Sequence, residues 1–166
     1  MMKTKVYVDT NIYVYAIIHH PTFGEACKRI LIDIGRRIHE FHGSLLVAME
    51  LLGSLSKINS HVARRALEDY LALPLTLLNL NEEVLRLASV VDEVVNIRYD
   101  AVHAAIMMLN SVSTIITNDV DDWNRLKDRF DEVLTRVKEE GYDISINKME
   151  VITPDSYEDW KKRSQL

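Results

Sequence analysis

Four acidic residues stand in apolar surroundings along this 166-residue chain. Three of them are each the only acid within a long stretch of sequence, and the fourth stands three residues after the apolar run STII. Asp and Glu are rarely buried unless they are paired with a cation or bound to a metal. These residues are therefore the first candidates for chemistry, and they are Asp9, Glu50, Asp100 and Asp119.

Each acid, taken singly, also has a purely structural interpretation. Asp9 and Asp119 could cap helices, and Asp100 could interact with a helix dipole in the first turn. Glu50 could pair with an arginine. Four such acids in one chain, two of them directly after apolar strands, favour a shared site instead.

Gathering four carboxylates in one place requires a counter-charge. Two carboxylates about 5 Å apart repel by roughly 3 kcal/mol at an effective dielectric constant near 20. No lysine or arginine lies within four residues of Glu50. Mg²⁺ and Mn²⁺ prefer oxygen ligands, and the chain lacks the Cys/His pattern of a zinc site. Such an ion most often works on phosphates, so the pattern indicates phosphodiester or phosphoryl chemistry.

The elements that must position these acids follow from hydrophobic periodicity. Buried strands are expected at 5–8, 38–43, 75–80, 113–116 and 149–152. Helices are expected at 10–18, 22–37, 45–58, 61–73, 82–95, 98–109 and 120–140. This alternation predicts a parallel sheet wrapped in helices. Sites in such sheets form at the carboxyl ends of the strands, where Asp9 and Asp119 stand.

Composition indicates one α/β domain of ordinary globular type. The chain is 48% hydrophobic and 27% charged, with a single cysteine, Cys27, and no visible membrane span. A cytoplasmic location is the expectation. The net charge of −5 argues against nucleic-acid binding by bulk positive charge, although it leaves room for a local basic face.

Four motifs together resemble the PIN-domain ribonucleases, and within them the VapC-type toxins of toxin–antitoxin pairs. The motifs are VYVDTN at 6–11, SLLVAMELLGSL at 44–55, YDAVHAA at 99–105 and IITNDVDDW at 115–123. The resemblance implies a PIN-like three-layer α/β/α fold with a central parallel sheet over the single domain 1–166. It also implies hydrolysis of RNA phosphodiester bonds by an endoribonuclease that depends on a divalent metal.

The resemblance assigns roles to particular residues. Asp9, Glu50, Asp100 and Asp119 would be catalytic and would bind one or two Mg²⁺ or Mn²⁺ ions. Asp122 matches a less regular fifth acidic position, and Asp121 is expected to be solvated. The small polar residues that orient the carboxylates or the attacking water would be Asn11 and Thr117.

Partners are also implied. The substrate would be RNA, the inhibitor a small antitoxin, and a homodimer could form through apolar residues in 62–73 or 82–95. Basic residues that could contact RNA phosphates are Arg29, Arg36, Arg37, Lys57, Arg64 and Arg65.

Three further features accompany these assignments. His103 could face the site, but a core histidine is the favoured interpretation, and Trp123 is expected to pack as a core lid. The segment 124–148 is longer than the family usually has, and an extended amphipathic helix with Gly141 as its stop is expected there. It could extend a dimer face, contact a partner or reshape the substrate groove.

Two alternatives stay open at the level of sequence. A PIN fold could have lost turnover and serve as an RNA-binding or assembly module. A receiver-like signalling domain would also gather aspartates around Mg²⁺, but it requires an acidic pair after the first strand and a lysine after the last. The chain has a lone Asp9 and the sequence MEVITPD at these places.

Overall fold

The computed structural model describes residues 3–166, and a five-stranded sheet forms its centre. All strand pairs are parallel, in the order β3-β2-β1-β4-β5. The strands are β1 (Lys5–Val8), β2 (Glu40–Ser44), β3 (Thr76–Leu78), β4 (Thr114–Ile116) and β5 (Glu150–Ile152). The order places β1, which is followed by Asp9, between β2 and β4.

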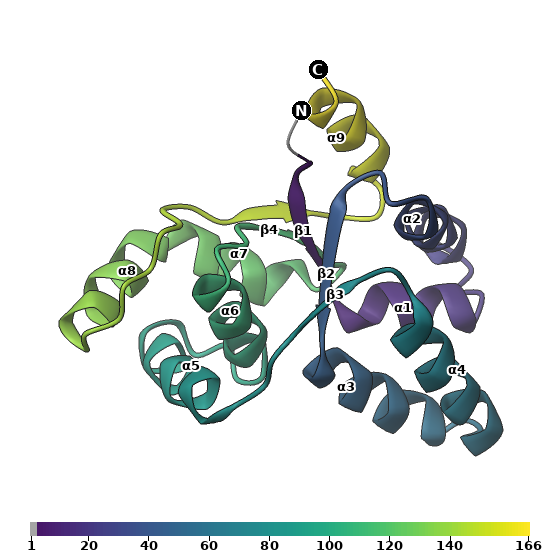
Figure 1. The fold of residues 1–166 in the computed structure, drawn as a ribbon, viewed down its shortest axis with the longest axis horizontal. Helices are drawn as coiled ribbons and strands as arrows, with labels where there is room; N and C mark the ends of the chain where they lie inside the picture. Colours follow the sequence, from purple (N-terminus) through teal and green to yellow (C-terminus); the bar gives the residue numbers. More distant parts are fainter. Residues whose placement is uncertain (1–2) are drawn as a thin grey trace.

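Helices cover both faces of this sheet (Figure 1). One group packs on one side and comprises α1 (Thr10–Ile17), α2 (Gly24–Arg36), α3 (Leu45–Ser56) and α4 (Ser60–Ala72). The other comprises α5 (Glu82–Val95), α6 (Asp100–Leu109), α7 (Val120–Asp128) and α8 (Phe130–Glu139). The predicted three-layer α/β/α fold is confirmed. No helix within residues 3–166 has the length and apolar character needed to span a bilayer.

Local sequence signals account for several helix boundaries. Ser44 caps α3 by accepting a hydrogen bond from the Val47 amide at 3.2 Å, and Asn81 caps α5 through the Val84 amide at 3.0 Å. Gly141 follows α8 with a φ of +91°, a conformation that glycine adopts without strain. The predicted stop at Gly141 is thus observed.

The single long helix expected at 120–140 is wrong, because the chain bends at Arg129 and forms α7 and α8. The bend lets each helix bury a different apolar face, α7 beside β5 and α8 against α5. The Arg129 guanidinium holds the bend by donating to the Val94 carbonyl at 2.9 Å, at the end of α5. Residues 140–149 then form no regular element.

A C-terminal helix, α9 (Tyr157–Ser164), was not predicted from the sequence. It lies at one end of the molecule, away from α3 and α4 (Figure 1). Its anchor is Asp33 of α2, which accepts hydrogen bonds from the Tyr157 hydroxyl and the Lys161 ammonium, both at 2.9 Å. Asp33 is only 5% exposed, so this buried carboxylate has its own cation.

Candidate metal centre

Asp9 and Asp119 meet because β1 and β4 are paired in parallel. Val8 lies opposite Ile116, and the Asp9 amide continues the ladder by donating to the Ile116 carbonyl at 3.0 Å. Both β1 and β4 therefore end at the same carboxyl edge of the sheet. The structure brings the residues that follow these strands to one place, as the parallel-sheet rule predicts.

Asp9 is 4% exposed and is held by neutral donors. Its Oδ1 accepts from the Thr10 amide at 2.7 Å, and its Oδ2 accepts from the Thr117 hydroxyl at 2.7 Å and the Asn11 amide group at 3.3 Å. The first of these is a helix-cap contact, so the structural interpretation of Asp9 also holds. None of these donors carries a positive charge.

Asn11 and Thr117 link the two strand ends into one unit. The Asn11 side chain donates to the Thr117 hydroxyl at 3.2 Å and accepts from the Asn118 amide at 3.0 Å. Thr117 in turn accepts from the Asp119 amide at 3.0 Å. These small polar residues fix the loop that carries Asp119 relative to Asp9.

Asp100, Asp119 and Asp122 form a carboxylate cluster in which one oxygen from each lies within 4.8 Å of the others. Asp119 stands at the N-cap position of α7 but makes no capping hydrogen bond with its side chain. Burial, together with Asp9 and Asp119, raises the pKa of Asp100 to about 9. Burial also raises the pKa of Asp119 from its usual value, and Asp122 adds to the effect. Without a cation, the cluster keeps a proton.

Glu50 reaches the same region from α3. Its Oε1 accepts from the Thr10 hydroxyl at 3.1 Å and from His103 Nε2. Burial raises the pKa of Glu50, but the hydrogen bond and charge of His103 and the hydrogen bond from Thr10 together outweigh burial, and the net pKa is lowered. Burial lowers the pKa of His103, yet Glu50 and Asp9 produce a net increase.

The acids line one hollow of about 260 Å³. Its lining combines carboxylates with small polar and apolar groups: Asp9, Thr10, Asn11, Val14, Tyr15, Glu50, Ser54, Asp100 and Asp119. Within residues 3–166, no lysine or arginine forms an ion pair with the four acids, and His103 is their basic neighbour. Asp122, at the edge of the cluster, pairs with Arg125 at 3.3 Å.

This donor set fits a hard divalent cation. Carboxylates without a lysine or arginine partner within residues 3–166, among them Asp100, which is neutral only because it is protonated, are suited to Mg²⁺ or Mn²⁺. The residues that could hold the ion are Asp9, Glu50, Asp100 and Asp119, with Asp122 beside them. Asp121 is exposed and lies outside the cluster, as expected for a solvated residue.

The arginines proposed to contact RNA do not line the hollow. Arg37 lies beside Glu40, where β2 begins, so it stands at the opposite edge of the sheet from the acids, and Arg36 precedes it at the end of α2. Arg29 faces Glu158 of α9 at 3.8 Å. Arg64 and Arg65 lie on α4, and neither residue lines this hollow.

Two residues of the site were underestimated from sequence. Thr10 was not singled out, although it directly follows Asp9 and opens α1. His103 is a buried, hydrogen-bonded histidine, as favoured, and it also contacts Glu50, which the core interpretation did not include. Trp123 is completely buried, which confirms the core role and leaves no exposed ring for a base.

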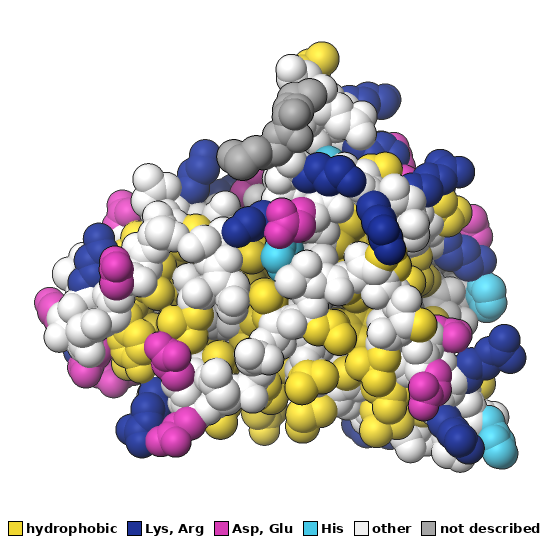
Figure 2. Space-filling view, in the orientation of Figure 1, with side chains coloured by type: hydrophobic (Ala, Val, Ile, Leu, Met, Phe, Trp, Pro, Cys, Tyr) yellow, Lys and Arg dark blue, Asp and Glu magenta, His cyan; other side chains and the backbone are white. Residues whose placement is uncertain are grey.

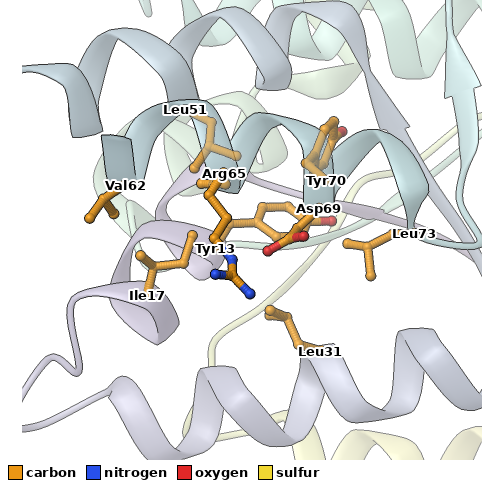
Figure 3. Close-up of a pocket in the computed structure, with 10 residues that line it drawn as sticks. Tyr13, Ile17, Leu31, Leu51, Val62, Arg65, Asp69, Tyr70 and Leu73 are labelled. Carbon is orange, nitrogen blue, oxygen red and sulfur yellow. The ribbon is translucent and has the colours of Figure 1, made fainter. Parts of the chain in front are cut away.

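An apolar groove of about 250 Å³ lies between α1, α2, α3 and α4. Figure 3 shows Ile17, Leu31 and Val62 lining it, with the charged ends of Arg65 and Asp69 among these apolar side chains. The groove shares two helices with the acidic hollow, because α1 carries Asn11 and Ile17 and α3 carries Glu50 and Leu51.

Comparisons with known proteins agree with this architecture. The fold is similar to that of VapBC2 from Rickettsia felis bound to a DNA fragment from their promoter, with a TM-score of 0.61 and 16% identity over 90% of this chain and 98% of that chain. DNA-bound VapBC from Salmonella typhimurium gives a TM-score of 0.58 and 14% identity over 91% and 98%. A toxin–antitoxin complex from Klebsiella pneumoniae gives 0.53 and 18% over 71% and 89%.

Sequence comparison assigns the family. No curated protein sequence gives a significant match. The family model described as PIN domain matches residues 6–128, which contain all four acids and every strand but β5. Since this match covers well over half of the chain, the protein is a member of the PIN-domain family.

Proposed function

We propose that the protein is a divalent-metal-dependent endoribonuclease and the toxin of a toxin–antitoxin pair. The observation that carries the proposal is the hollow itself, where carboxylates from β1, α3, α6 and the β4–α7 junction converge without a lysine or arginine among residues 3–166. Membership of the PIN family and the toxin–antitoxin neighbours support it.

The proposed mechanism is metal-assisted hydrolysis of RNA. Asp9, Glu50, Asp100 and Asp119 would hold Mg²⁺ or Mn²⁺, which when bound polarises a water molecule for attack at phosphorus and offsets the charge that develops on the phosphate. Thr117 and Asn11 hold Asp9 and the Asp119 loop in place. Asp100 must lose its proton to serve as a ligand, because its carboxyl group is protonated near neutral pH.

RNA cleavage with a matched control tests this proposal. The wild type, Asp100→Asn and Asp121→Asn would be incubated with structured and single-stranded RNAs in Mg²⁺, Mn²⁺ or EDTA. We expect the wild type and Asp121→Asn to cut only with metal and Asp100→Asn not to cut. Equal cutting by wild type and Asp100→Asn would reveal a contaminant. If the wild type binds Mn²⁺ but cuts no RNA, the catalytically silent PIN module becomes the better description.

The antitoxin is proposed to place an apolar segment in the groove of Figure 3. The groove is concave and apolar, with one cation and one anion at its opening, so it suits an inserted chain more than a flat surface. Because α1 and α3 border both the groove and the hollow, a chain seated there would continue toward the acids. Val62→Arg would place a charge in the groove and is expected to abolish copurification with the proposed antitoxin.

A homodimer is proposed through α3, although exposed apolar residues also occur in 62–73 and 82–95. Leu45, Met49 and Leu52 are spaced along one face of α3 and are 48%, 62% and 40% exposed. Figure 2 shows hydrophobic side chains gathered over the part of the surface where α3 lies in Figure 1. A flat apolar stripe suits a second copy of the same helix. Met49→Lys should yield a monomer in sedimentation velocity. The proposed location of the protein is the cytoplasm.

A further inference from the structure

A chain of buried hydrogen bonds runs behind Glu50. The Ser44 hydroxyl contacts the Tyr7 hydroxyl at 2.8 Å, the Tyr7 hydroxyl contacts His103 Nδ1 at 2.7 Å, and His103 Nε2 contacts Glu50. Tyr7 and Ser44 are completely buried, and His103 is 1% exposed. The chain joins β1, the start of α3, and α6, three of the elements that carry the acids.

The chemistry of Glu50 sets the direction of this chain. A carboxylate only accepts, so His103 Nε2 must donate to it in either charge state of the imidazole. In the neutral imidazole, Nδ1 then accepts from the Tyr7 hydroxyl, whose oxygen accepts from Ser44. The Ser44 oxygen itself accepts from the Val47 amide at 3.2 Å. When the imidazole is neutral, each hydroxyl and ring nitrogen of this chain of hydrogen bonds thus has a defined role as donor or acceptor.

The contacts on Glu50 are confined to one of its two oxygens. Thr10 and His103 both bond to Oε1, and no hydrogen bond to Oε2 is formed by any residue in the described range 3–166. A glutamate on a half-exposed helix face has several rotamers available, and two bonds to one oxygen select among them. The other oxygen is left for a ligand.

We propose that Tyr7 and His103 are positioning residues that orient Glu50 as a metal ligand, an inference that rests on the proposed function. Partners one bond removed from a metal ligand typically affect affinity by about 10- to 100-fold. Tyr7 acts through His103, and His103 acts through Glu50. Neither residue needs to touch RNA or the ion.

Mn²⁺ titration followed by electron paramagnetic resonance tests this role without RNA. We expect Tyr7→Phe, which removes one hydroxyl from the core, to weaken Mn²⁺ binding about 10-fold, and His103→Leu to weaken it by up to about 100-fold. His103→Gln can still donate to Glu50, so it should recover part of the loss. The rank of the variants is the readout that a merely structural role would not produce.

Tyr157→Phe is the matched control. It also removes a buried hydroxyl and a 2.9 Å hydrogen bond, to Asp33, but far along the chain from the acids. Its Mn²⁺ affinity should equal that of the wild type even if its melting temperature falls. If Tyr7→Phe folds and binds Mn²⁺ as tightly as the wild type does, the positioning role is overturned. This test does not depend on whether His103→Leu folds. Absence of Mn²⁺ binding in the wild type would instead contradict the proposed function.

Discussion

Asp9 and Asp33 are both buried aspartates, with 4% and 5% of their surface exposed, but only Asp33 pairs with a lysine, whereas the basic neighbour of Asp9 is His103, with Nε2 3.9 Å away. Asp33 accepts from the Lys161 ammonium at 2.9 Å and so ties α2 to α9. Asp9 is surrounded by an amide, a hydroxyl and a carboxamide, with further carboxylates nearby. A charge that the fold itself neutralises serves stability, whereas a charge left to neutral donors is available to a ligand.

The largest expected effect comes from removing the charge of Asp9, which pairs with no lysine or arginine among residues 3–166. Asp9→Asn should reduce RNA cleavage by at least about 100-fold, because a ligand should matter no less than the groups that orient it. Cleavage rates at saturating Mg²⁺ measure this. An Asp9→Asn variant with wild-type activity would break the comparison, since Asp9 would then be only the cap of α1.

The next effect concerns Asp33, whose charge is neutralised by Lys161. Asp33→Asn should lower the free energy of unfolding by about 1–3 kcal/mol, because the Lys161 ammonium loses its buried charged partner. Thermal unfolding should show a fall of roughly 2–4 °C per kcal/mol for a chain of this size. The cleavage rate should stay at the wild-type value, and a parallel loss of activity would show that α9 also supports the acidic hollow.

A pH-dependent effect on stability is expected from Asp100→Asn in EDTA. The pKa of Asp100 is raised from 3.8 to about 9, so the unfolded chain loses this proton first as the pH rises. Stability of the wild type should therefore fall between about pH 4 and pH 9, and the asparagine variant should lack this part of the decline. Its melting temperature should exceed that of the wild type by an amount that grows across this range. Parallel curves would contradict the raised pKa.

The smallest effects should separate the last two aspartates of ITNDVDDW. Asp122 lies in the carboxylate cluster but already pairs with Arg125, so Asp122→Asn should lower cleavage by less than about 10-fold. Asp121 is exposed, and Asp121→Asn should change the free energy of unfolding by less than about 0.5 kcal/mol and leave cleavage unchanged. Equal losses in both variants would point to the general negative field of the loop.

Features that depend on residues close together in the sequence could be predicted. Asn81 as a cap and the apolar face that follows it predict α5 at its observed bounds, Glu82–Val95. Asp9, Glu50 and Asp100 could be found because no other acid lies near them in the sequence, and Asp119 because it follows the apolar run STII. Their order also matches the family motifs, which suffices to identify the fold.

Information that depends on packing was not readable in this way. The bend at Arg129 exists because α7 and α8 meet different neighbours, β5 and α5, which no periodicity in 120–140 reports. The positions of Arg36 and Arg37 follow from the direction of β2, which begins at the edge away from the acids. The contact of His103 with Glu50 joins residues far apart in sequence and needs both α3 and α6 in place.

The pairing of β4 beside β1 has a consequence for synthesis of the protein. Asp119 enters the hollow only when β4 occupies its place in the sheet, after more than two thirds of the chain has been translated. A nascent chain that ends before this strand lacks one of the four acids, so under the proposed function it could not yet cut RNA. The acidic hollow is complete only once β4 has joined the sheet beside β1.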